Sequence, residues 1–289
     1  MARIGPALLA TALALGLLTA GAGAAKAASA VDGMERVTFA STADLGSADP
    51  LSLVGYLSRP DGPGPFPAVV LLHGCGGVQS NTAIWRAFFV SHGYAVFAVD
   101  SFQTRGVTEI CRSTGQVTWT MRAADAFGAL DHLAKQPFIR ADRVLAMGFS
   151  HGAGIALDIA TARRLKERPA AAPRFRASLA LYPACGYAVR RDADYRTPVF
   201  IGVGTADDWT PAPACEGLAA RQSGTGMVEL RLYQGAAHSF DNVGRPVRFL
   251  PDVLNRNRPD GRGATVGGSP DALAAVQADV ERFLSATLR

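Results

Sequence analysis

The sequence has few of the features that mark metal-binding, redox or nucleic-acid-binding proteins. Only four of its 289 residues are cysteine, and none of these lies in a C-x-x-C or other metal-ligand spacing. Its net charge of +5 comes from scattered basic residues, without a basic helix or a basic patch interleaved with aromatic residues. We therefore expect no metal site, no thiol redox centre and no nucleic-acid partner.

Charged residues are also scarce, at 18%, whereas hydrophobic residues make up 48% of the chain. The sequence contains no internal repeat. This composition is typical of a globular chain with a large core. We predict one domain over residues 31–289.

The first thirty residues differ in composition from the rest of the chain. Arg3 is followed by the apolar stretch ALLATALALGLLTAGAGAA and by two A-x-A sites that end at Ala27 and Ala30. This pattern predicts a secretory signal peptide over residues 1–30, cleaved near Ala27 or Ala30, and a secreted or periplasmic protein. A retained membrane anchor is the alternative, but the apolar stretch is interrupted by glycines and short for a bilayer span, so we expect no stable anchor.

The four cysteines are expected to form disulfides in an oxidising compartment. They are Cys75, Cys111, Cys185 and Cys215. Four cysteines allow three pairings, and the sequence alone does not choose between them. Our preference is for Cys75 with Cys111 and Cys185 with Cys215.

Apolar segments and helical patterns alternate along the chain. The segments that predict strands are 36–41, 51–58, 68–72, 94–99, 144–147, 178–182, 199–203 and 228–233. The segments that predict helices are 81–92, 117–135, 152–166, 212–222 and 270–288. This alternation predicts an α/β fold with a mainly parallel eight-stranded sheet and helices on both faces. We expect an antiparallel hairpin joined through RPDGPGPFP, a polar surface loop over 255–269, and no large cap domain.

The segment VLAMGFSHGAG, residues 144–154, places Ser150 in a Gly-x-Ser-x-Gly turn directly after an apolar strand. A strand, a tight turn of this kind and a helix form a nucleophile elbow. The pentapeptide alone is common, but Asp207 follows the seventh predicted strand and His238 follows the eighth. The order Ser, Asp, His on these loops is that of a hydrolase triad. We expect His238 to take the Ser150 proton and Asp207 to orient the imidazole.

A serine hydrolase also needs donors for the oxyanion. The segment HGCGG, residues 73–77, follows the third predicted strand. We expect one backbone N–H from His151, the residue after the predicted nucleophile, and the second from Cys75, with Gly74 as the alternative.

With these motifs in this order, the chain resembles the dienelactone hydrolase family, which has the α/β-hydrolase fold, from about residue 54 to 288. The matching segments are VVLLHGCGG, FAVDSFQTRGV, MGFSHGAG, GTADDWTP, GAAHSFD and ALAAVQADVERFL. The resemblance implies a hydrolase of esters or lactones that needs no cofactor. The family spacing Asp-x-x-x-Pro, which ends here at Pro211, favours Asp207 over the adjacent Asp208.

The resemblance also points to residues that bind substrate. Arg105 lies where the family places a substrate-binding arginine, although an arginine paired structurally with an acid is the alternative. Phe149 and Trp209 are expected to line the substrate pocket, with a place in the core as the alternative.

The chain departs from the namesake enzymes at two positions. They carry a cysteine nucleophile and a glutamate in the segment that matches HGCGG, whereas this sequence has Ser150 and no acid between His73 and Gly77. The sequence therefore predicts an exported serine esterase that acts on a small ester or lactone through an acyl-enzyme. The alternatives are an acyltransferase, a polyester or peptide hydrolase with the same triad, and a non-catalytic binding protein with this fold.

Overall fold

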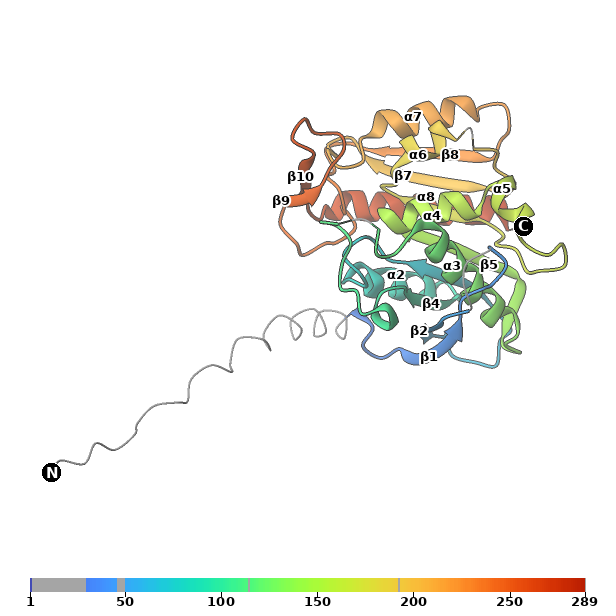
Figure 1. The fold of residues 1–289 in the computed structure, drawn as a ribbon. Helices are drawn as coiled ribbons and strands as arrows, with labels where there is room; N and C mark the ends of the chain where they lie inside the picture. The colour runs from blue at the N-terminus through green and yellow to red at the C-terminus, as the bar shows by residue number, and fades with distance from the viewer. Residues whose placement is uncertain (2–29, 46–49, 114, 192, 289) are drawn as a thin grey trace.

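The computed structural model of the chain describes residue 1 and residues 30–45, 50–113, 115–191 and 193–288 (Figure 1). Nearly all of the predicted signal peptide therefore lies outside the described residues. Within the described ranges, no helix combines the length and apolar character that crossing a membrane requires.

An eight-stranded sheet forms the centre of the molecule (Figure 1). Its strands are β1 (Glu35–Ala40), β2 (Ser52–Ser58), β3 (Phe66–Leu72), β4 (Ala95–Asp100), β5 (Ile139–Phe149), β6 (Ser178–Leu181), β7 (Val199–Gly204) and β8 (Val228–Tyr233). They are arranged in the order β1-β2-β4-β3-β5-β6-β7-β8, and β2 alone runs against the others. This confirms the predicted mainly parallel sheet and its eight strands.

The expected hairpin through RPDGPGPFP is wrong, because β2 and β3 are not neighbours in the sheet. Strand β2 pairs with β1 and β4, both antiparallel, and β3 pairs with β4 and β5, both parallel. The chain crosses over from β3 through α2 (Asn81–Ser91) to β4, and β4 pairs with the edge of β3 that β2 would occupy in a hairpin. The linker therefore carries the chain across β4 to the middle of the sheet.

Helices cover both faces of the sheet, as predicted. They are α2 (Asn81–Ser91), α3 (Trp119–Ala134), α4 (His151–Ile159), α5 (Ala162–Lys166), α6 (Cys185–Arg190), α7 (Ala212–Arg221) and α8 (Pro270–Thr287), with a short 3-10 turn at Gln103–Arg105. Apolar residues of α2 and α8 share one core with the sheet, and those of α3, α4 and α7 form the cores on the other face.

The single helix predicted over 152–166 is divided into α4 and α5. Thr161 lies between them with an extended backbone, at φ −83° and ψ 150°, and its side chain accepts a hydrogen bond from the Arg164 N–H. A threonine in this role caps the start of a new helix.

The loop predicted over 255–269 is wrong in part, because Arg262–Val266 forms strand β10. It pairs antiparallel with β9 (Arg248–Leu254), and the two form a separate hairpin at one end of the main sheet, on the left of Figure 1. The carboxylate of Asp208 accepts hydrogen bonds from the backbone N–H (2.7 Å) and hydroxyl (3.0 Å) of Thr265. The residue pattern of 255–269 could not predict this contact, because Asp208 is distant in the sequence.

Two disulfides join the four cysteines in the preferred pairing. Cys75 bonds Cys111, and Cys185 bonds Cys215. The first ties the loop after β3 to the segment before α3, and the second ties α6 to α7. All four cysteines are thus oxidised, as is usual in oxidising compartments.

Candidate active site

Ser150 lies at the sharp turn between β5 and α4, with φ +52° and ψ −113°. The close approach of three segments explains the flanking glycines. A Cβ on Gly148 would lie 2.1 Å from the Gly152 carbonyl oxygen, and a Cβ on Gly152 would lie 2.0 Å from the Leu72 carbonyl oxygen. Neither position has room for a side chain, so the turn holds Ser150 in a strained conformation above β3.

Ser150, His238 and Asp207 form one hydrogen-bonded chain. The Ser150 Oγ lies 2.9 Å from Nε2 of His238, and Nδ1 of His238 lies 2.8 Å from Oδ2 of Asp207. An imidazole that donates from Nδ1 to a carboxylate presents an unprotonated Nε2 to the hydroxyl. His238 and Asp207 are both buried. The three residues thus meet the geometric requirement for a serine activated by a histidine.

The two adjacent carboxylates in GTADDWTP point to different partners. Asp207 accepts the backbone N–H groups of Trp209 (2.9 Å) and Thr210 (2.8 Å) at Oδ1, and the Thr210 hydroxyl at Oδ2 (3.0 Å). These bonds orient its carboxylate toward His238. Asp208 instead holds β10 through its hydrogen bonds with Thr265.

The loop that carries His238 is attached to the core through Asp241. This buried carboxylate accepts hydrogen bonds from Trp85 Nε1 (2.9 Å), the Tyr182 hydroxyl (2.6 Å) and Asn81 Nδ2 (3.2 Å). Burial raises the pKa of Asp241, and the three donors oppose that rise. The Tyr182 ring also meets the His238 imidazole edge-on, with ring centroids 4.7 Å apart. The histidine is thereby held by α2 and the end of β6.

The two segments expected to supply oxyanion donors both lie beside Ser150. His151 is the first residue of α4, where its N–H has no carbonyl of the same helix to bind. Gly74 and Cys75 line the same cavity as Ser150, and a Cβ on Gly74 would lie 3.6 Å from the Ser150 Cβ. The Cys75 carbonyl accepts the Ile110 N–H at 2.8 Å, so Cys75 is held by its backbone as well as its disulfide.

Arg122, on α3, connects these two segments and was not found by sequence reasoning. Its Nη1 lies 2.8 Å from Nδ1 of His151, and its Nη2 donates to the His73 carbonyl oxygen at 2.6 Å. Burial lowers the pKa of Arg122 to about 10. Burial and then the Arg122 charge lower the pKa of His151 to about 3, so this imidazole is neutral. The only hint in the sequence is an arginine inside the apolar face of MRAADAFGAL.

Ser150 opens into a cavity whose empty space, including open solvent at its entrance, is about 790 Å³. Trp209 lines it, and its ring lies 4.8 Å from the His238 ring. Phe149 also borders the cavity, but it is 2% exposed and packs in the core, which was the alternative place for it. The Trp209 indole N–H donates to the Leu254 carbonyl at 2.8 Å, so its position depends on the β9–β10 hairpin.

The family follows from a match that covers most of the chain. A model of the dienelactone hydrolase family matches residues 53–263. The chain belongs to the dienelactone hydrolase family. Membership of this family makes it a carboxylic ester hydrolase.

Known proteins of the family and fold are similar to this chain at low identity. A probable 2-oxo-3-(5-oxofuran-2-ylidene)propanoate lactonase of Bradyrhizobium sp is 24% identical over 65% of this chain and 79% of its own length. Est2, a thermophilic esterase of Thermogutta terrifontis solved with propionate bound, is 18% identical over 88% of this chain and 94% of its own, with a TM-score of 0.59. A dienelactone hydrolase of Anabaena variabilis is 17% identical over 89% and 99%, with a TM-score of 0.60. These structural likenesses show the α/β-hydrolase fold.

The substrate-binding role expected of Arg105 from the dienelactone hydrolase resemblance needs correction. Both terminal nitrogens of its guanidinium bind the Asp125 carboxylate, at 2.8 and 2.9 Å, and Nη1 also donates to the Ser101 carbonyl. Asp125 is fully buried, so its charge requires this partner. The pairing with an acid is therefore the one that the structure shows.

Two other arginines line the Ser150 cavity of this dienelactone hydrolase family member. Arg245 and Arg248 lie on its wall, and neither has a carboxylate partner among the described residues. Sequence reasoning missed them because it assigned no element and no role to residues 242–254, where Arg248 begins strand β9.

Proposed function

We propose that the chain is an exported serine hydrolase that cleaves a small ester or lactone through an acyl-enzyme intermediate. The observation that carries the proposal is the hydrogen-bonded chain from Ser150 through His238 to Asp207 on the wall of a small-molecule cavity.

In this mechanism the Ser150 oxygen attacks the ester carbonyl while Nε2 of His238 takes the hydroxyl proton. Asp207 stabilises the imidazolium that forms. The N–H groups of His151 and Cys75 bind the negative oxygen of the tetrahedral intermediate, with Gly74 as the alternative to Cys75. His238 then gives its proton to the leaving alcohol, and water, activated in the same way, releases the acid from Ser150.

Export is supported by the composition of the N-terminal segment and by the two disulfides. Of the two cleavage positions, burial favours Ala27. Ala30 and Val31 are buried in the core that includes Trp85, and a chain beginning at residue 31 would lose the first of these contacts. N-terminal sequencing of the exported protein is expected to give Ala28 as the first residue.

The substrate is proposed to carry a negative charge near its ester. The guanidinium groups of Arg245 and Arg248 have no carboxylate partner among the described residues, and a guanidinium binds a carboxylate with two parallel hydrogen bonds. The name of the similar Bradyrhizobium lactonase likewise describes an anionic lactone.

Labelling by a fluorophosphonate tests the proposal, because this probe reacts with an activated serine. We expect intact-mass analysis to show one adduct, which peptide mapping places on Ser150 and which the Ser150→Ala variant lacks. A matched control is Ser239→Ala, which removes another serine hydroxyl from the same cavity wall and should label normally. A folded wild-type protein that stays unlabelled would contradict the proposed mechanism.

A further inference from the structure

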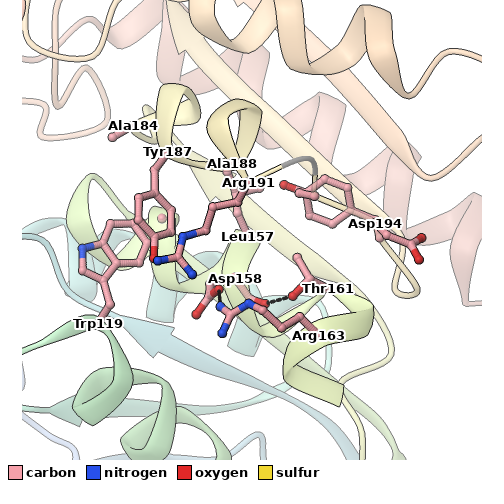
Figure 2. A pocket seen from close by; sticks show the side chains of 13 residues that line it. Trp119, Leu157, Asp158, Thr161, Arg163, Ala184, Tyr187, Ala188, Arg191 and Asp194 are labelled. Carbon is pink, nitrogen blue, oxygen red and sulfur yellow. Dashed lines mark hydrogen bonds and ion pairs between the residues drawn. The ribbon is translucent and has the colours of Figure 1, made fainter. Parts of the chain in front are cut away.

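A second cavity lies beside α4 (Figure 2), and its empty space, including open solvent at its entrance, is about 550 Å³. Residues of α3, α4 and α6 and of the segment before β7 line it. None of the described residues lines both this cavity and the one at Ser150. It is therefore a separate pocket, which the mechanism proposed above does not use.

One wall of this second cavity is aromatic. The rings of Trp119 and Tyr187 stack with centroids 4.6 Å apart and an angle of 20° between their planes, and both residues are only partly buried. Leu157 of α4 and Ala188 of α6 add apolar surface beside them. Such a wall suits a flat apolar body.

The carboxylate of Asp158, on the opposite side, is already neutralised. It binds Arg163 and also Nε of Arg164, the latter at 2.6 Å, and Figure 2 shows Arg163 reaching it. Asp158 therefore offers little attraction to a cationic ligand.

Two polar groups of the second cavity have no hydrogen-bond or ion-pair partner among the described residues. The Arg191 guanidinium lies 4.7 Å from the centre of the Tyr187 ring and pairs with no described carboxylate. The Tyr195 hydroxyl is buried without a hydrogen-bond partner, and Tyr195 is only 3% exposed. Burial, and then the Asp158 charge, raise the pKa of Tyr195, so its hydroxyl keeps its proton. An arginine can only donate, and a neutral tyrosine can donate.

We propose that the second cavity binds a small carboxylate with a flat apolar body. The apolar body would pack against Trp119 and Tyr187, and the carboxylate would accept from Arg191 and Tyr195. The buried Tyr195 hydroxyl is a donor without a partner, which is costly, and an anionic acceptor at this place would satisfy it and also pair with the guanidinium of Arg191, which is an exposed residue.

The three tryptophans of the chain allow a direct test by NMR, with 2-naphthoate as the probe. Trp119 lines the second cavity, Trp209 lines the Ser150 cavity, and Trp85 is buried in the core. In the ¹⁵N-labelled protein each indole N–H gives one resonance, which substitution of each tryptophan by phenylalanine assigns. We expect 2-naphthoate to shift the Trp119 resonance in a saturable way. A titration that moves only the Trp209 resonance, or none, would overturn the proposal, whether or not Ser150 is catalytic.

Variants separate specific binding from general attraction to a basic surface. Arg191→Gln and Tyr195→Phe are each expected to weaken the Trp119 titration about tenfold, which is the effect of losing one hydrogen bond to a charged group. Tyr195→Phe should leave the fold intact because the hydroxyl has no partner to lose. Arg190→Gln removes the same charge from the neighbouring position, which does not line the cavity, and should bind normally. Equal affinities for 2-naphthoate and neutral 2-naphthamide would also contradict the carboxylate assignment.

Discussion

Arg122 and His151 are joined by a hydrogen bond of 2.8 Å from a guanidinium nitrogen to Nδ1 of the imidazole, directly behind Ser150. Arg122 is 1% exposed, and it also binds the carbonyl of His73 in the neighbouring loop. One buried side chain thus fixes the distance between the two backbone segments from which the proposed oxyanion donors come.

Arg122 is therefore expected to act as a positioning residue. Arg122→Met should lower kcat for p-nitrophenyl acetate by about tenfold to a hundredfold with a smaller change in KM, because misplaced donors weaken transition-state binding. Arg122→Lys keeps the charge and one donor and should recover part of the loss. Circular dichroism checks that both variants are folded, and an unchanged kcat in a folded Arg122→Met variant would contradict this role.

His151 is expected to make stability depend on pH. Its folded-state pKa is about 3, against an ordinary value of 6.5, so between these values the unfolded chain binds a proton that the folded chain does not. The contribution of His151 to the free energy of unfolding is complete above pH 6.5. It is lost as the pH falls toward 3, by up to about 1.4 kcal/mol per pH unit. Urea unfolding at several pH values gives the free energy of unfolding as a function of pH. This free energy should fall less steeply with decreasing pH in His151→Gln than in the wild type. Parallel slopes for the two proteins would count against this prediction.

The two disulfides are expected to differ in their effect on activity. They close chain segments of similar length, with separations of 36 and 30 residues, so removing either should cost about 4 kcal/mol of unfolding free energy. Cys75 and Cys111 line the Ser150 cavity, whereas Cys185 and Cys215 are buried under α6 and α7.

Replacing Cys75 and Cys111 by serine should therefore lower kcat, by about tenfold, at a temperature where the variant is folded. Replacing Cys185 and Cys215 should destabilise the protein and leave kcat unchanged. Calorimetry and ester hydrolysis on the two double variants make the comparison, and an equal loss of kcat in both would refute it.

Gly152 is expected to tolerate no side chain. A Cβ there would lie 2.0 Å from the Leu72 carbonyl oxygen and 2.5 Å from that of His73, so β3 or α4 would have to move. Gly152→Ala should cost at least about 3 kcal/mol. Gly217, in α7, has nothing within 4 Å of the same added atom, and Gly217→Ala should stabilise the helix by about 0.5–1 kcal/mol. Denaturant unfolding of both variants gives the two changes in the free energy of unfolding. Similar changes in the two variants would contradict this prediction.

Arg245 is expected to select esters that carry a negative charge. Arg245→Gln should raise KM about tenfold for an ester with a free carboxylate and leave a neutral ester of the same size unaffected. Arg262→Gln is a suitable control, because Arg262 lies in β10 and does not line the cavity. If KM changes equally for both esters, charge recognition by Arg245 is excluded.

Local patterns in the sequence were sufficient for the eight strands of the sheet, for most of its covering helices and for the order of Ser150, Asp207 and His238. These elements follow from the spacing of their own apolar residues, whereas α6 (Cys185–Arg190) was not predicted and α4 and α5 were predicted as one helix. The family order of motifs assigned the three residues to the loops after the fifth, seventh and eighth strands. Because the carboxyl ends of parallel strands share one edge of a sheet, their order along the chain was enough to bring these loops together.

Contacts between distant segments decided the rest, because no local pattern contains them. Asp125 forms an ion pair with Arg105, and Asp208 accepts a hydrogen bond from Thr265 of β10. Strand β4 lies between β2 and β3 in the sheet. Arg122 lies behind Ser150 only because α3 packs beside α4. The sequence by itself determined the eight strands of the main sheet and the order of the chemical groups along the chain. The tertiary structure decided which charges are paired within the protein and which remain to bind a ligand.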